Sequence, residues 1–262
     1  MIIDGHSHVM LPVKQHIETM NRAGVDKTIL FSTTIHPEET ENFSGMQREM
    51  QRLNEILQGK HNAANTAKQK SIQELKQVII TYPTHYLGFG PVPVGLPEEE
   101  LNAYMEQEII KNGFIGLGEF TLPSGAVHLL DPIARASQNF KNLPLWIHGF
   151  NPLALQDIKE IAELAKKFPS IPIILGHLGG SNWLETIPLV KEIPNLYMDI
   201  SAFFSTLVLK VAIQELPDKC IFGVDMPYGD LELSLAAVRK VSKSKAVTDA
   251  VLGENIAALL KL

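Results

Sequence analysis

The chain has 262 residues, of which 45% are hydrophobic and 20% are charged, and its formal net charge is -6 at neutral pH. This length and composition predict a globular chain with a continuous hydrophobic core, built as one large domain or two small ones. The negative charge argues against nucleic acid and anionic membranes as partners, because both bind basic surfaces.

The single cysteine and the hydropathy pattern indicate the compartment. Cys220 has no partner for an intramolecular disulfide, and its apolar neighbours predict a buried, inert thiol. No basic segment followed by a long apolar one opens the chain, and the most apolar interior run, residues 202–213, is interrupted by polar side chains. We therefore expect a cytoplasmic protein without targeting or membrane-spanning segments. Whether it forms a homo-oligomer stays open.

A short apolar run at residues 2–4 predicts a first strand that leads into His6 and His8. Side chains two residues apart lie on the same face of a strand, so both imidazoles would point to the same place. Such a pair is half of a metal site. Taken alone, the pair has a second interpretation as two structural or incidental histidines.

Helical and strand patterns then alternate along the chain. Apolar residues at helical spacing predict helices at 13–23, 97–111, 153–168, 183–192, 203–215, 231–241 and 246–262. Short apolar runs predict further strands at 25–32, 86–90, 114–118, 145–148, 173–177, 196–199 and 221–225. A polar segment around residues 34–77 carries two more helical patterns and predicts a helical insertion, which we expect to pack on the barrel wall rather than to move as a lid.

Eight expected strands with interleaved helices predict an α/β fold with a parallel sheet. Glu119, His148 and His177, which end successive strands, are spaced 29 residues apart, close to the roughly 30 residues that a (β/α)8 barrel allots to each unit. We expect a single (β/α)8 TIM barrel over residues 1–262. A doubly wound open sheet is the alternative, but it would gather ligands only at its switch point.

Six metal-competent side chains stand at the carboxyl ends of the expected strands. They are His6, His8, Glu119, His148, His177 and Asp225. Each alone is better explained as a hydrogen-bonded core residue or a helix cap. Together they predict a metal site at the carboxyl ends of the strands, because burying so many ionisable groups is costly unless a cation compensates them.

These strand ends resemble the motifs of the amidohydrolase superfamily, and within it the amidohydrolase-related (amidohydrolase 2) branch. The resemblance spans nearly the whole chain and rests on Ile-Asp-Gly-His6-Ser-His8, Gly-Leu-Gly-Glu119, Trp-Ile-His148-Gly, Leu-Gly-His177-Leu-Gly-Gly, Tyr-Met-Asp199-Ile-Ser and Phe-Gly-Val-Asp225-Met-Pro.

The resemblance implies a divalent metal, commonly zinc, held by His6, His8, His148 and Asp225. It implies that His177 is either a further ligand or the residue that polarises the substrate. A glutamate at the position of Glu119 bridges two metals in the similar TatD-like group, so a second metal stays open. We expect one tightly held zinc ion, with a second as the alternative.

The expected reaction is hydrolysis of an amide, ester or lactone of a small molecule. A bound metal lowers the pKa of water from about 16 towards 7 and polarises a carbonyl. Asp225 would act as general base and then general acid, and His177 would stabilise the oxyanion. Three other functions stay open: a decarboxylase of unsaturated or aromatic carboxylic acids, a TatD-like nuclease, which the acidic charge disfavours, and a non-catalytic metal-binding barrel.

Supporting residues are expected around this centre. Asp4, Asp199 or Ser201 would orient the imidazoles. Loop residues are expected to contact the substrate or to pack the loops, namely His36, Phe150, Phe204 and Tyr228. All arginines lie in expected helices, so no guanidinium is placed to hold a substrate carboxylate.

Overall fold

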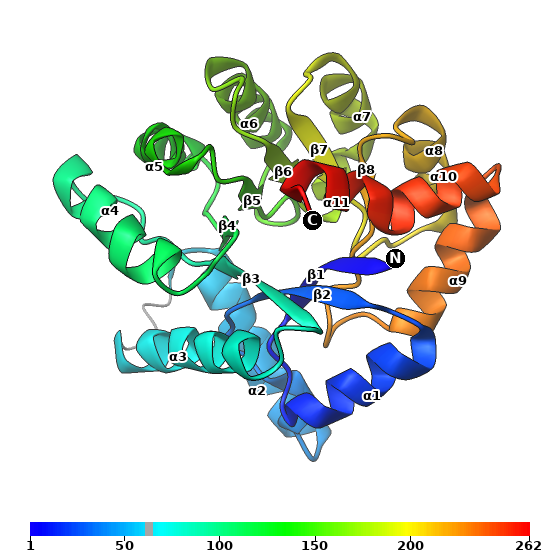
Figure 1. Ribbon diagram of the computed structural model, residues 1–262, viewed down its shortest axis with the longest axis horizontal. Helices are drawn as coiled ribbons and strands as arrows, with labels where there is room; N and C mark the ends of the chain where they lie inside the picture. The colour runs from blue at the N-terminus through cyan, green and yellow to red at the C-terminus, as the bar shows by residue number, and fades with distance from the viewer. Residues whose placement is uncertain (61–64) are drawn as a thin grey trace.

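The computed structural model describes residues 1–60 and 65–262, so residues 61–64 of the expected insertion lie outside the described residues. Eight parallel strands follow one another around a barrel in chain order, with helices on the outside (Figure 1). The (β/α)8 prediction is confirmed. The strands are β1 Ile3–His8, β2 Lys27–Phe31, β3 Tyr86–Gly90, β4 Gly116–Phe120, β5 Leu145–Ile147, β6 Ile173–Leu175, β7 Leu196–Asp199 and β8 Cys220–Ile221.

The helices agree with the predicted ranges except in three places. They are α1 Val13–Ala23, α2 Phe43–Leu57, α3 Asn65–Thr81, α4 Glu98–Tyr104, α5 Asp131–Ser137, α6 Leu155–Lys167, α7 Trp183–Glu192, α8 Thr206–Glu215, α9 Leu231–Val241, α10 Lys245–Asp249 and α11 Asn255–Leu260. The helix expected at 97–111 changes to π-helical geometry after α4, and a π-helical stretch separates α10 from α11. The sequence placed Arg135 in an expected helix but gave no bounds for it, because the 7 residues of α5 are too few to establish a helical repeat.

The barrel closes through the segment that follows β8. The strand predicted at 221–225 ends at Ile221, and the chain beyond it bonds directly to β1. Gly5 N donates to Phe222 O at 2.8 Å, and His6 O accepts from Asp225 N at 2.6 Å. The closure therefore places Asp225 beside the His6 and His8 pair.

Large apolar side chains fill the barrel interior below the strand ends. This inner cluster joins strands β1, β2, β3, β5, β6 and β8 to Ile256 of α11. α11 lies against β1 and β8, with the two chain ends near each other in this view (Figure 1). Since Ile256 packs with Ile3 at the start of β1, α11 covers the amino end of the barrel and leaves the carboxyl end for the site.

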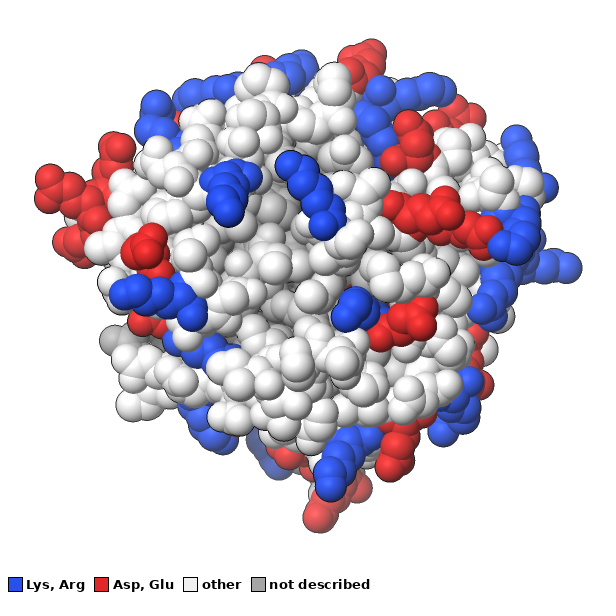
Figure 2. All heavy atoms as spheres, viewed as in Figure 1, with Lys and Arg blue, Asp and Glu red and all other residues white. Residues whose placement is uncertain are grey.

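Charged side chains of both signs are interspersed around the rim of the face seen in Figure 2, and its centre is mainly uncharged. No continuous basic surface appears on this face, in keeping with the negative net charge. Within the described ranges, none of the helices has the combination of length and hydropathy that crossing a bilayer requires.

Candidate metal centre

All six predicted strand-end residues converge at the carboxyl end of the barrel. Their ligand atoms form two groups whose members lie within 4.8 Å of one another: His6, His8 and Asp225 in one, and Glu119, His148 and His177 in the other. The groups adjoin, because His6 Nε2 lies 3.6 Å from Glu119 Oε2. His148, expected to share a metal with His6, His8 and Asp225, belongs to the second group.

Asp199, at the end of β7, fixes the tautomer of His6. The His6 Nδ1–H donates to Asp199 Oδ2 at 2.7 Å, so the lone pair of the neutral ring is on Nε2, which faces the centre. His6 Nε2 is buried and has no hydrogen-bond partner among the described residues. A buried imidazole nitrogen that faces carboxylates and has no hydrogen-bond partner is typical of a metal ligand in the absence of its metal.

Ser201 links Asp199 to His177 and so fixes the tautomer of His177 as well. The Ser201 hydroxyl donates to Asp199 Oδ2 at 2.7 Å, so its oxygen can only accept from His177 Nδ1–H at 2.9 Å. The neutral His177 ring therefore presents its Nε2 lone pair to the centre. One carboxylate, Asp199, thus orients two imidazoles. The sequence predicted Asp199 or Ser201 in this role.

His148 is oriented by a backbone carbonyl that the sequence analysis missed. His148 Nε2–H donates to Asn151 O at 3.1 Å, which leaves the lone pair on Nδ1. Nothing in the sequence marks this contact, because it depends on the course of the loop after β5 rather than on a side-chain type.

This arrangement of acceptors fits a divalent cation. His148 Nδ1, His177 Nε2 and Glu119 Oε1 lie 3.1 Å from one another, and in the neutral tautomers none of the three carries a hydrogen to share. Three lone pairs at this distance repel unless a positive charge lies between them. Imidazole nitrogens and carboxylate oxygens are ligands suited to zinc and other first-row metals.

The electrostatics of the centre also favour a positive charge. Burial lowers the pKa of His6, but the Glu119 and Asp199 carboxylates outweigh burial and hold this pKa well above its ordinary value. Burial raises the pKa of Glu119, but His6, His148 and His177 outweigh it and hold this pKa well below its ordinary value. The cluster therefore stabilises cationic species and keeps Glu119 ionised.

Asp225 occupies a strained backbone conformation beside His8. Its φ of 64° lies in the left-handed region that non-glycine residues rarely adopt, and its Oδ1 lies 3.2 Å from His8 Nε2. Burial raises the pKa of Asp225, but the contact with His8 and the charges of His177 and His6 lower it to about 2. Asp225 is therefore a carboxylate at neutral pH, free to accept a proton.

Asp4 and Ser7 hold the backbone on both sides of Asp225. Asp4 Oδ1 accepts from Val224 N at 3.0 Å, and Ser7 Oγ accepts from Met226 N at 3.1 Å while donating to Asp4 Oδ2. Asp4 touches the His6 backbone but not its ring. Its role is thus to fix the segment that carries Asp225, which differs from the imidazole-orienting role that the sequence suggested.

A cavity of about 870 Å³ leads to the centre. His8, Glu119, His148, His177 and Asp225 line one part of it, and side chains from the βα loops, α2 and α3 line the rest. Phe150 and Tyr228 line this cavity as substrate contacts would, whereas His36 and Phe204 do not. The two insertion helices therefore form part of the wall of the candidate active site.

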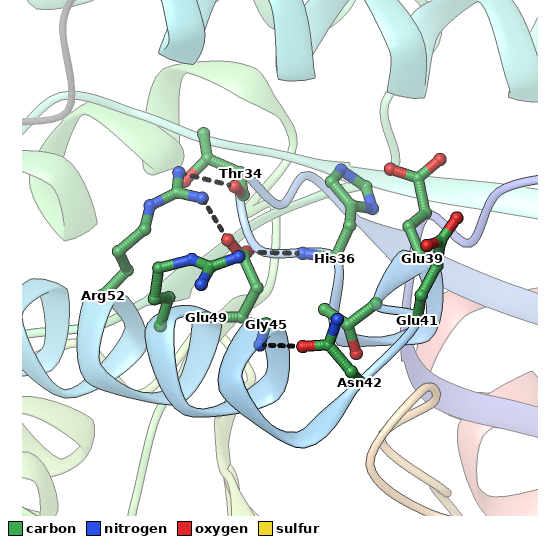
Figure 3. A pocket seen from close by; sticks show the side chains of 10 residues that line it. Thr34, His36, Glu39, Glu41, Asn42, Gly45, Glu49 and Arg52 are labelled. Atoms are coloured by element: carbon green, nitrogen blue, oxygen red, sulfur yellow. Dashed lines mark hydrogen bonds and ion pairs between the residues drawn. The ribbon is translucent and has the colours of Figure 1, made fainter.

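A second, smaller cavity of about 420 Å³ lies beside α2 (Figure 3). His36 lines it, and Arg52 donates to Glu49 at 2.6 Å and to Thr34 O at 3.1 Å. Glu49 also accepts from His36 N at 3.2 Å. These bonds tie α2 to the loop after β2, so Arg52 is already paired and is not available to a ligand.

Comparisons with known proteins identify the family of the chain. A family model described as amidohydrolase matches residues 3–262, nearly the whole chain. No curated protein sequence matches the chain.

Solved structures of the same fold cover almost the entire chain. An uncharacterised TIM-barrel protein from Bordetella bronchiseptica is 15% identical with a TM-score of 0.71, covering 99% of this chain and 98% of its own. A putative amidohydrolase from Staphylococcus aureus is 16% identical with a TM-score of 0.69, covering 100% and 99%. A dihydroxybenzoic acid decarboxylase from Polaromonas, solved with manganese and the inhibitor 2-nitroresorcinol, is 17% identical with a TM-score of 0.66, covering 100% and 97%. At these identities the likeness establishes the fold.

Proposed function

Because the chain belongs to the amidohydrolase family, whose model matches residues 3–262, we propose that this enzyme is a metal-dependent hydrolase of a small-molecule amide, ester or lactone. The whole chain would act as one catalytic domain, since the barrel and the insertion both line the cavity.

The proposed metal ligands are His6, His8, His148 and Asp225, with Glu119 and His177 close enough to complete the site or to hold a second ion. A divalent metal bound there, with zinc as our first choice, supplies a water of lowered pKa and a Lewis acid for the substrate carbonyl. Asp199, Ser201 and the carbonyl of Asn151 keep the three imidazole lone pairs directed inward.

Asp225 is proposed as the residue that moves the proton. Its Oδ1 has no hydrogen-bond partner among the described residues, and its low pKa keeps it ionised. It would accept a proton from the attacking water and return it to the leaving group.

His177 is proposed to stabilise the developing oxyanion. Burial lowers its pKa, but the hydrogen bond to Glu119 and the charges of Asp225 and Glu119 raise it above the ordinary value. The protonated ring would donate from Nε2, since Nδ1–H is already engaged by Ser201.

One observation carries the proposal. His6 Nε2, His148 Nδ1, His177 Nε2 and Glu119 converge where an 870 Å³ cavity reaches the strand ends, and His6 Nε2 is buried with no hydrogen-bond partner among the described residues. A merely structural cluster would give this nitrogen a hydrogen-bond partner and would not need the cavity.

Decarboxylation of a small aromatic or unsaturated carboxylic acid is the second candidate. The similar Polaromonas structure is a dihydroxybenzoic acid decarboxylase with bound manganese, and the cavity walls here are largely apolar. An acid centre in such surroundings can protonate carbon instead of directing water. A TatD-like nuclease is less well supported, because the chain is acidic overall.

The test begins with metal content. Chelator-treated protein would be reloaded with zinc or manganese, and metal per chain would be counted by elemental analysis. Each form would then be assayed against amides, esters and lactones for incorporation of ¹⁸O from water, and against aromatic acids for release of CO₂.

Two variants separate binding from chemistry. His6→Ala should lose metal and activity together, whereas Asp225→Asn should keep the fold and lose turnover far more than metal. Full metal retention in His6→Ala would contradict the proposed site, and CO₂ release without hydrolysis would select the second candidate.

A further inference from the structure

Over the described residues, the large cavity is lined by one ammonium group, that of Lys68. Among the described residues that line it, the acidic residues are Glu119 and Asp225, both at the candidate metal centre. No lysine or arginine other than Lys68 is among these lining residues. Lys68 comes from α3 in the insertion, so it belongs to a different part of the wall from the strand ends. The cavity thus carries a metal-binding end and a separate cationic group.

The ammonium group of Lys68 differs from those of Lys70 and Lys76 on α3 in having no partner among the described residues. Lys70 pairs with Glu74 at 3.4 Å, and Lys76 donates to Glu108 at 2.6 Å. Over the described residues, no ion pair or hydrogen bond involves the Lys68 ammonium group. It is exposed in the cavity wall and free to bind an anion.

The remaining wall of the cavity is largely apolar. Leu53, Ile56 and Leu57 of α2 and Ile72 of α3 line it, and Tyr104, Phe120, Phe150 and Tyr228 contribute aromatic rings. Such a lining favours a ligand with a hydrophobic or aromatic body, and polar groups at its ends would fix its orientation.

Resting on the proposed function, we propose that Lys68 binds an anionic group, a carboxylate, at the end of the substrate remote from the metal. The substrate class is then a small molecule with a reactive carbonyl or carboxyl group at one end, an apolar or aromatic body, and a second carboxylate at the other. Lys68 is a specificity-determining residue from the insertion, and arginine is not needed for this role because a single ammonium suffices for a carboxylate.

The test compares three pairs of ligands on the zinc-loaded full chain by calorimetry. Every ligand is a benzoate, which supplies the first carboxylate. Within a pair, the para substituent ends in a carboxylate in one ligand and in the matching primary amide in the other. The three pairs differ in the link to the ring, which is a direct bond, one methylene or two methylenes. Wild type should bind at least one dianion about tenfold more tightly than its amide, which is the ratio expected from one charge-assisted hydrogen bond.

Lys68→Met should remove this preference, Lys68→Arg should keep most of it, and Lys70→Met, the control on the same helix, should leave it unchanged. The proposal is overturned if no dianion is preferred or bound by wild type, or if the preference survives in Lys68→Met.

Failure of the proposed function would show up separately. In that case the chain would hold no metal, or the amides would bind equally well with and without zinc, whatever the ratio between dianion and amide.

Discussion

Replacing Asp199 with asparagine tests whether one buried carboxylate controls the metal centre. The substitution keeps the shape of the side chain but removes its charge. Asp199 accepts hydrogen bonds from His6 Nδ1, Ser201 Oγ and Ser201 N, each at 2.7 Å. Two of these bonds orient imidazoles, His6 directly and His177 through the serine hydroxyl.

The expected loss follows from these two paths. Removing a group that orients one metal-bound histidine typically lowers metal affinity about 10- to 100-fold. Because Asp199 serves two imidazoles, Asp199→Asn should reach the upper end, a loss of about 100-fold, or about 2.7 kcal/mol at 1.36 kcal/mol per decade. Zinc dissociation constants would be measured by competition with a chromophoric chelator, with circular dichroism as the check on folding.

Asp157 offers a matched control. It is another buried aspartate that accepts hydrogen bonds, from Ser124, Gly125 and Ala154, but it anchors α6 and lies outside the candidate metal centre. Asp157→Asn should lower thermal stability and leave zinc affinity within about twofold of wild type. If Asp199→Asn binds zinc as tightly as wild type, or if both variants lose affinity equally, the orienting role of Asp199 is refuted.

Three further outcomes are expected. Gly223→Ala should weaken zinc binding without unfolding the chain, because the added Cβ would lie 2.6 Å from Asp199 Oδ1, and chelator competition would measure the loss. Gly116→Ala should lower the free energy of unfolding by roughly 1–3 kcal/mol in urea titrations, because its Cβ would overlap the Phe89 ring; unchanged stability would contradict this packing. Cys220 should react with a disulfide reagent at pH 8 only in denaturant, because burial raises the pKa of its thiol and leaves little thiolate in the folded chain; rapid labelling of native protein would disprove this.

Local patterns predicted the elements well where periodicity and stop signals coincide. α1 matches its predicted range, 13–23, because its helical repeat ends at Gly24, which adopts the left-handed conformation of a C-cap. β3 likewise matches 86–90. β8 was predicted four residues too long at its carboxyl end, because residues 222–225 bond to β1 across the barrel seam, and that pairing has no local signal.

In the candidate site, too, the sequence predicted the features that depend on local patterns and missed those that depend on distant contacts. Residue type and position at strand ends predicted the six residues that converge, including His177 and Glu119. The tautomers, the contact between His148 and Asn151, and the distinct role of Asp4 depend on contacts made only after folding. Nothing in the sequence indicated that Lys68 lines the cavity, because a lysine on a polar helix is ordinarily a solvated surface residue.

The seam between β1 and the segment after β8 has a consequence during protein synthesis. Asp4 and Val224, which bond across it, are 220 residues apart in the chain. At about 5–20 residues per second, the ribosome needs roughly 10 to 45 s to add the second half of the seam after the first has been made. His6 and His8 are therefore made long before Asp225, and the nascent chain can complete its candidate metal site only once nearly the entire barrel has been synthesised.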